Sequence, residues 1–145
     1  MKIKQIEIEN FRCYQKAELQ FSDRVTILIG KNGSGKSSLL KSIKNVLSVF
    51  FSNNPSWGYG TIAGTVSELG VSNLDSGEVW HDENMKPADF VGIKAFACET
   101  DNEGNIVGEI PSWAFRKSST ANAKLQSSYY KDAYVYFRTH YTDDA

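Results

Sequence analysis

The sequence predicts an α/β fold: a mixed sheet that also carries an antiparallel part. Three observations lead to this expectation. An apolar, β-branched run at Val25–Ile29 is followed by a glycine-rich loop and an amphipathic helix. Two alternating segments precede that run, and a strand–turn–strand pattern follows at 90–117. A strand–loop–helix unit combined with antiparallel strands is typical of a domain with helices packed on a sheet.

Size and composition are those of a soluble domain. The 145 residues are 41% hydrophobic and 23% charged, which is ordinary for a globular chain with a modest core. No apolar run reaches the roughly 18 residues that a membrane span needs, and the N-terminus lacks the apolar stretch of a signal peptide. Cys13 and Cys98 match no metal or redox spacing. We therefore expect a cytoplasmic protein with reduced thiols and no membrane partner.

Charge is distributed unevenly along the chain. The net charge is −1, but residues 1–46 hold nine Lys/Arg against four Asp/Glu, and the remainder is acidic. A basic first third suits a polyphosphate ligand. Nucleic acid usually needs a broader basic face, so the composition alone does not predict DNA binding.

The N-terminal region predicts two strands. In residues 1–10, Ile6 and Ile8 alternate with glutamates, while Ile3 is out of phase and suggests a kink. Residues 17–21 alternate again and predict a second short strand. We expect residues 10–16 to connect the two strands. The run Val25–Ile29 predicts a strand buried on both faces, as in a parallel sheet under helices.

An amphipathic helix is predicted after the glycine-rich loop. Its expected apolar face repeats at helical spacing and contains Leu39, Leu40, Ile43, Val46, Leu47 and Phe50. The opposite face is expected to carry Lys41, Lys44 and Asn45. Asn, Pro and Gly after Ser52 end this helix.

The rest of the chain divides into three further segments. Residues 52–89 predict an irregular insertion, with a short helix near 66–69. Residues 90–117 predict a β-hairpin whose second strand is broken at Pro111. Residues 122–142 predict an aromatic helix, with a strand left open at the alternating AYVYF. Its tyrosines and phenylalanine could stack on bases, but core packing is the commoner role of such a stripe.

Residues 30–37 match the Walker A phosphate-binding pattern G-x-x-x-x-G-K-[ST] in full. The glycines allow backbone conformations that a Cβ forbids, and the loop N–H groups then form a nest for an anion. We expect Lys36 to reach the β- and γ-phosphates, Ser37 to ligate Mg²⁺, and Ser38 to add a donor near the α-phosphate. The predicted nucleotide-binding residues of the loop are Gly30, Lys31, Asn32, Gly33, Ser34, Gly35, Lys36, Ser37 and Ser38.

The pattern IKQIEIENFRCYQKAELQF…VTILIGKNGSGKSSLLKSI resembles the N-terminal half of ABC-class P-loop ATPases of the SMC, RecF and OLD-like group. The shared features are the I-x-I-x-N-F-R strand and turn, the N-G-S-G-K-S loop and the S-L-L-x-x-I helix. The resemblance covers residues 1–47 strongly and the later hairpin and helix loosely. It implies a partial ATPase head: a P-loop core with N-terminal strands at 1–51, an insertion at 52–89, a hairpin of the antiparallel subdomain at 90–117 and a helix at 122–142.

The resemblance also implies cofactors, partners and a further site residue. ATP and Mg²⁺ would bind the loop, and Arg12 would lie beside the phosphates or the adenosine. The remainder of the ATPase domain and a second head would be protein partners, in DNA repair, chromosome maintenance or phage defence. No Asp-Glu strand end and no signature loop stand where this class needs them. We therefore expect hydrolysis by the full-length protein, and nucleotide binding without turnover by this chain, which has no catalytic residue of its own.

Two other interpretations remain open. The chain could be a nucleotide-responsive binding module that acts by partner contact without catalysis. It could also belong to another P-loop class such as a kinase, although no pocket with its own aspartate base is recognisable. No base-reading motif is present, so DNA binding stays open. His81 and His140 stand alone and predict no metal site.

Overall fold

The computed structural model describes residues 1–48, 78–119 and 127–141 of the chain. The short helix expected near 66–69, the segment 52–77 of the predicted insertion and the ends of the predicted helix 122–142 lie outside the described residues.

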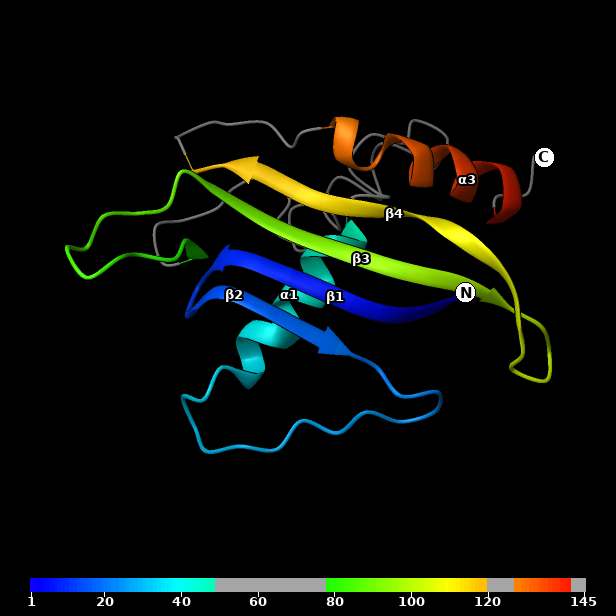
Figure 1. Ribbon diagram of the computed structural model, residues 1–145, viewed down its shortest axis with the longest axis horizontal. Coiled ribbons are helices and arrows are strands. Elements are labelled where there is room, and N and C mark those ends of the chain that lie inside the picture. The colour runs from blue at the N-terminus through cyan, green and yellow to red at the C-terminus, as the bar shows by residue number, and fades with distance from the viewer. Residues whose placement is uncertain (49–77, 120–126, 142–145) are drawn as a thin grey trace, which may run out of the picture.

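Four antiparallel strands form one sheet in the order β2-β1-β3-β4 (Figure 1). The strands are β1 Lys2–Phe11, β2 Tyr14–Gln20, β3 Phe90–Thr100 and β4 Ile106–Ser118. β1 pairs with both β2 and β3, so it joins the two N-terminal strands to the later pair. The predicted hairpin at 90–117 and the first predicted strand are confirmed.

Alternation along β1 decides which face of the sheet is buried. Ile6 and Ile8 are 0% and 1% exposed, and they pair with apolar residues of β3. Glu7, between them, and Glu9, after Ile8, lie on the other face, where Glu7 is opposite Lys94. A register shift between Ile3 and Gln5 produces the expected kink.

The connection between β1 and β2 is shorter than the expected 10–16. Phe11 already pairs with Tyr14, which leaves only Arg12 and Cys13 in the turn. β2 is an edge strand, and an edge strand keeps polar residues in the ladder as readily as apolar ones. Lys16, for example, pairs with Glu9. The alternating pattern therefore missed the first residues of β2, which begins at Tyr14.

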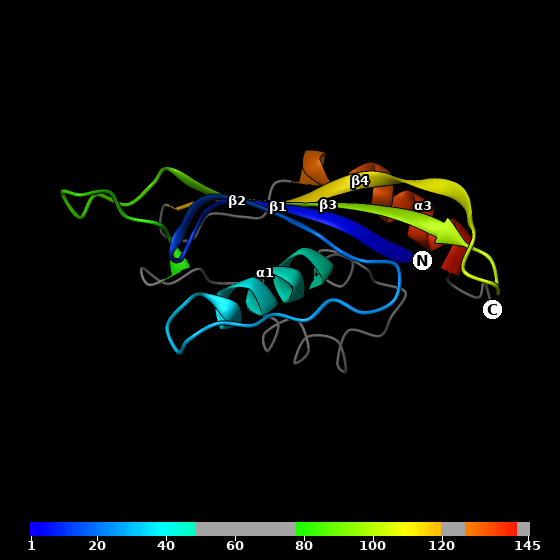
Figure 2. The same ribbon diagram turned by 60° about the horizontal axis from the view of Figure 1, so that its bottom comes forward.

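Helix α1, Lys36–Ser48, packs on one face of the sheet (Figure 2). Val46 is fully buried, as expected, but the face prediction is wrong at Leu40 and Asn45. Leu40 is 60% exposed, whereas Asn45 is 2% exposed. Leu39, Ile43 and Leu47 pack against the core as expected, and Ser38, Ser42 and Asn45 are buried together with Val46. The hydrophobic pattern could not indicate that these small polar side chains are buried.

The second strand of the hairpin is continuous through Pro111. Its pairing changes register there, because Ala95 pairs with Trp113 while Ala97 pairs with Ile110. A bulge of this kind places a proline where no ladder hydrogen bond from its nitrogen is needed. The expected break is therefore a bulge in β4.

The C-terminal aromatic segment is helical, not a strand. A 3-10 turn at Ser127–Tyr129 precedes α3, Lys131–Tyr141, which lies along β4 at the sheet edge opposite β2 (Figure 1). Tyr130 and Ala133 are buried, and Phe137 meets Trp113 edge-to-face with ring centroids 6.0 Å apart. These aromatic residues serve packing. No helix in the described residues has the length and apolar character needed to cross a membrane.

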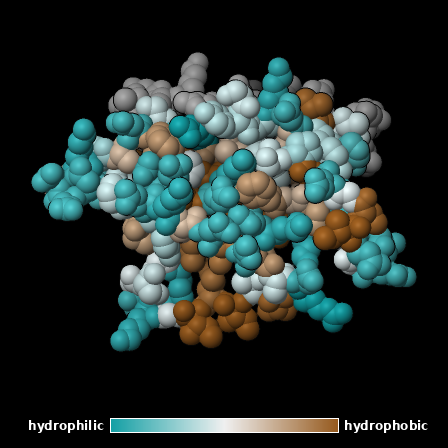
Figure 3. Space-filling view, viewed as in Figure 1, coloured by the Kyte–Doolittle hydropathy of each residue, from teal (hydrophilic) through white to brown (hydrophobic). Residues whose placement is uncertain are grey.

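The predicted buried strand at Val25–Ile29 is wrong. This segment is irregular, and three of its four apolar side chains, Val25, Ile27 and Ile29, are 69%, 74% and 91% exposed. Figure 3 shows hydrophobic surface at its lower edge, where Figure 1 has the loop between β2 and α1 that contains this segment. A strand buried on both faces needs neighbouring strands for its N–H and C=O groups. Among the described residues, no strand pairs with this run.

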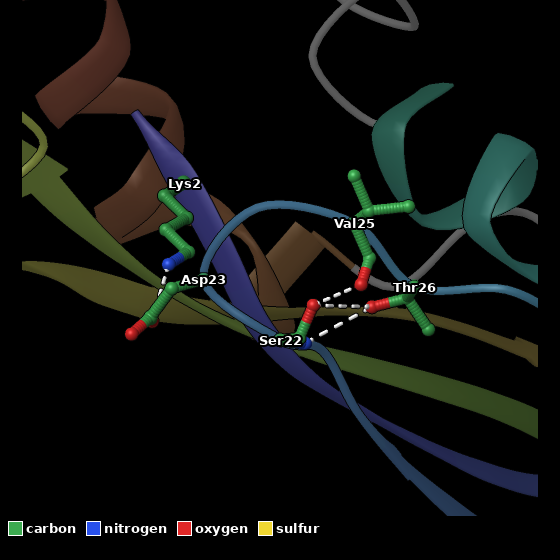
Figure 4. A network of polar contacts seen from close by, with 5 residues as sticks. All are labelled: Lys2, Ser22, Asp23, Val25 and Thr26. Carbon is green, nitrogen blue, oxygen red and sulfur yellow. Dashed lines mark hydrogen bonds and ion pairs between the residues drawn. The ribbon is translucent and has the colours of Figure 1, made fainter.

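Local polar contacts hold the beginning of that segment in a turn (Figure 4). The Ser22 hydroxyl donates to the Val25 carbonyl, and the Ser22 N–H donates to the Thr26 hydroxyl at 3.0 Å. Lys2 binds Asp23 at 2.5 Å, which ties the turn to β1 and lowers the pKa of the Asp23 carboxyl. Serine and threonine favour such turns because their side chains compete for backbone partners.

Trp113 provides a test of how α1 is held on the sheet. Its side chain is 1% exposed, and its indole N–H donates to the Val46 carbonyl at 2.8 Å. We expect Trp113→Phe to lower the free energy of unfolding by about 2–4 kcal/mol, because it removes a buried hydrogen bond and leaves a void. Urea denaturation measures this loss. Trp80→Phe, at a half-buried position, is the control, and equal losses in the two variants would contradict the assignment.

Candidate nucleotide-binding site

The glycine-rich loop takes a conformation that depends on its glycines. Gly33 and Gly35 have φ of 82° and 97°, in the left-handed region that L side chains rarely adopt. Residues 31–34, which include Gly33, form a turn. It is closed by the Ser34 N–H, which donates to the Lys31 carbonyl at 3.1 Å. The chain then enters α1 at Lys36.

The N-terminus of α1 is electropositive. The Leu39 N–H donates to the Gly35 carbonyl at 3.0 Å, so Gly35 is the residue that caps the helix. The N–H groups of the first turn have no acceptor within the helix, and they carry the positive end of the helix dipole. No acidic side chain lies in this turn to neutralise it. Such a terminus is suited to an anion.

Lys36 folds back across the loop. Its ammonium group donates to the carbonyl of Gly30, to that of Lys31 at 2.9 Å and to the Ser34 hydroxyl at 3.5 Å. These three acceptors surround the charge on the loop side. A phosphate that approached the loop would meet this ammonium and the N–H groups of the helix together.

Arg12 reaches the same helix end from the sheet. It has a φ of 52°, a left-handed conformation that costs a non-glycine residue about 1 kcal/mol or more. Its N–H donates to the Glu78 carbonyl at 2.9 Å, which holds the turn. Its guanidinium donates to the Ser38 hydroxyl at 3.3 Å. The strained turn thus directs a cation to the first turn of α1.

These elements enclose a cavity of about 410 Å³. Eight of the ten residues proposed from the sequence line it: Arg12, Lys31, Asn32, Gly33, Gly35, Lys36, Ser37 and Ser38. Gly30 and Ser34 do not line it but contact Lys36 instead. Cys13 also lines it and was not among the expected residues. Its position directly after Arg12 in a tight turn was the available signal.

The profile of the AAA ATPase domain matches residues 1–136. The chain belongs to the AAA ATPase domain family.

Relatives of this AAA ATPase domain agree with that assignment. The chain is 29% identical over 154 residues to the DNA replication and repair protein RecF of Bacillus velezensis, covering 94% of the chain and 41% of the relative. It is 55% identical over 42 residues to the DNA double-strand break repair Rad50 ATPase of Methanosarcina mazei, covering 29% of the chain and 4% of the relative. The chain therefore spans less than half of the length of these relatives.

A solved structure shows the same fold. It is described as "Structural biochemistry of ATP-driven dimerization and DNA stimulated activation of SMC ATPases", and it matches with a TM-score of 0.53 and 20% identity. The match covers 86% of the chain and 67% of that structure. The resemblance to SMC- and RecF-like ABC-class ATPases is confirmed, and so is the α/β P-loop fold class.

Proposed function

We propose that the chain binds ATP·Mg²⁺ in the cavity between the β1–β2 turn and the N-terminus of α1. The supporting observation is the charge of the cavity wall, which contains Arg12, Lys31 and Lys36 and, among the described residues, no carboxylate. The helix end adds unpaired N–H groups on the same side. A polyphosphate is the ligand chemistry that complements such a site.

Each polar group has a role in this proposal. The Lys36 ammonium would give up its hydrogen bonds to the loop carbonyls and bind the β- and γ-phosphates instead. Arg12 would bind phosphate or the adenosine end. The exposed Ser37 hydroxyl fits a magnesium ligand, because Mg²⁺ takes few protein oxygens and completes its octahedron with phosphate and water. Bound Mg²⁺ would neutralise charge between the phosphates. Ser38, which Arg12 holds, would donate near the α-phosphate.

The complete protein is proposed to be an ATPase acting in DNA repair or chromosome maintenance. The names of the RecF and Rad50 relatives support this role. The exposed Val25, Ile27 and Ile29 offer apolar surface that the remainder of an ATPase domain would cover. A second ATPase head is the proposed dimer partner, in line with the ATP-driven dimerization named for the matching SMC structure. Hydrolysis is assigned to the complete protein, and the present chain is expected to hold ATP without turnover.

Direct titration tests this proposal. Calorimetry with the 145-residue chain is expected to show one ATP·Mg²⁺ site, weaker when EDTA removes the metal, with no phosphate released over hours. Ser37→Ala is expected to weaken the metal dependence, because it removes the proposed protein oxygen ligand. Absence of binding by the folded chain would refute the proposed function.

Arg12 gives a separate prediction. Arg12→Ala is expected to weaken ATP·Mg²⁺ binding about tenfold, because a charge-assisted hydrogen bond to phosphate is lost at a partly exposed site. Lys16→Ala is the matched control, since it removes a cation from the same hairpin. Lys16 does not line the nucleotide cavity and lies near Glu9 and Glu18, beside a separate pocket on the sheet. Equal affinities of the two variants, measured by calorimetry, would exclude Arg12 from the site.

A further inference from the structure

Tyr14 links the sheet to the first carbonyl of α1. It is the first residue of β2, and its hydroxyl donates to the Gly35 carbonyl at 3.2 Å. The same carbonyl accepts the Leu39 N–H at 3.0 Å. Gly35 therefore has two donors on one oxygen, one from its own helix and one from a strand 21 residues earlier in the chain.

The contact between Tyr14 and Gly35 is close enough to require a glycine. A Cβ added to Gly35 would overlap the Tyr14 hydroxyl, and it would lie 2.9 Å from the ring carbon that bears this hydroxyl. The Cys13 sulfur would be 3.1 Å away. The space that Gly35 leaves empty is thus occupied by the tyrosine, in addition to the left-handed φ that favours glycine there.

The hydroxyl acts as a donor under all ordinary conditions. Burial raises the pKa of Tyr14 above its usual value of 10.0, and the neighbouring Cys13 thiol raises it further. A protonated phenol can donate to a carbonyl, whereas a phenolate cannot. The bond to Gly35 is therefore present throughout the neutral range.

The geometry of the peptide unit carries the effect into the cavity. The Gly35 carbonyl and the Lys36 N–H belong to one planar trans peptide, so they point in opposite directions. The hydrogen bond from Tyr14 holds the Gly35 carbonyl in place and so fixes the direction of the Lys36 N–H. This N–H points out of the helix at its N-terminal end. Gly35 and Lys36 both line the cavity.

We propose that Tyr14 is a positioning residue of the phosphate loop: its hydroxyl sets the Gly35–Lys36 peptide so that the N-terminus of α1 faces the bound phosphates. This inference rests on the proposed nucleotide site and adds a residue to it that makes no contact with the ligand. The sheet, through the start of β2, thereby sets the orientation of the anion site on the helix.

Tyr14→Phe tests this inference, because it removes the hydroxyl and keeps the ring. We expect it to weaken both ATP·Mg²⁺ and inorganic pyrophosphate by about three- to tenfold, the loss that corresponds to one hydrogen bond. The backbone amide resonance of Lys36 should shift in the free protein. Tyr136→Phe is the matched control: it removes a hydroxyl that bonds Glu99 at 2.9 Å, away from the cavity, and it should change neither readout.

The outcomes separate the two proposals. If wild type binds and Tyr14→Phe binds both ligands within twofold of it, the positioning role is overturned. A loss for ATP·Mg²⁺ without a loss for pyrophosphate also overturns it, since Tyr14 would then act on the nucleoside. If wild type binds neither ligand, the proposed function itself fails and the role of Tyr14 fails with it.

Discussion

Replacing Lys36 by alanine is expected to weaken ATP·Mg²⁺ binding by at least about 100-fold. The ammonium is the cation that the loop surrounds, held by the carbonyls of Gly30 and Lys31 and by the Ser34 hydroxyl. Hydrogen bonds that involve a charged group contribute about 1.5–3 kcal/mol each, and the proposed site gives Lys36 two phosphates to bind. Isothermal calorimetry on the folded variant measures this loss.

Lys44→Ala is the control for the loss of charge. Lys44 lies on the same helix, two turns further on, and does not line the cavity. It is expected to change the affinity less than about threefold, since a distant, half-buried charge outside the cavity is screened by salt. Binding by Lys36→Ala as tight as that of Lys44→Ala would place the ligand elsewhere.

Gly35→Ala is expected to impair both folding and binding. An alanine at a φ of 97° is strained, and its methyl would overlap the Tyr14 hydroxyl. We expect the free energy of unfolding to fall by about 2 kcal/mol or more. Affinity for ATP·Mg²⁺ should fall at least about tenfold, because the helix end would be displaced. A loss of about 1.4 kcal/mol of binding free energy already gives a tenfold weaker affinity. Urea denaturation and calorimetry measure the two losses.

Gly104→Ala separates backbone strain from contact. Gly104 has a φ of 87°, and a Cβ there would meet nothing within 4 Å. Its loss of stability should be about 1 kcal/mol, from conformation alone, with unchanged affinity. If Gly35→Ala lost no more stability and no more affinity than Gly104→Ala, the close contact between Tyr14 and Gly35 would contribute to neither.

The sequence predicted local features well where one pattern decided them. Alternating isoleucines placed β1 and its buried face, and Ile3 out of phase indicated the bulge that shifts the register. The Asp101–Gly104 turn marked the hairpin, whose strands pair as expected. The helical spacing of apolar residues likewise predicted α1, which begins at Lys36 directly after the glycine-rich loop. Each of these depends on neighbours in sequence, so the pattern contains the information.

Features that depend on distant partners were predicted less well. Val25–Ile29 has the composition of a buried strand, but burial requires strands beside it, and the turn at Ser22 competes for its first residues. Asn45 is buried and Leu40 is exposed, because the side of α1 that is covered is decided by tertiary packing and not by hydrophobicity alone.

The site shows the same division. The loop residues follow from their motif, whereas the approach of the β1–β2 turn to α1 is a tertiary contact. The resemblance to the ATPase group suggested that Arg12 would lie at the site, and the structure places it against Ser38. For Cys13 the only signal in the pattern was its position next to Arg12, and nothing indicated that Tyr14 binds the Gly35 carbonyl. Such contacts can be read only once the hairpin and the helix are placed together.

The location of the nucleotide is measured most directly by amide resonances of the ¹⁵N-labelled chain during titration with ATP·Mg²⁺. The account predicts that the largest shifts fall on Gly33–Ser38 and on Arg12, whose groups line one cavity. Resonances of the opposite sheet face, around Lys94 and Arg116, should remain unchanged. Shifts confined to that opposite face, or saturation without any shift between Gly33 and Ser38, would contradict the assignment of the loop as the nucleotide site.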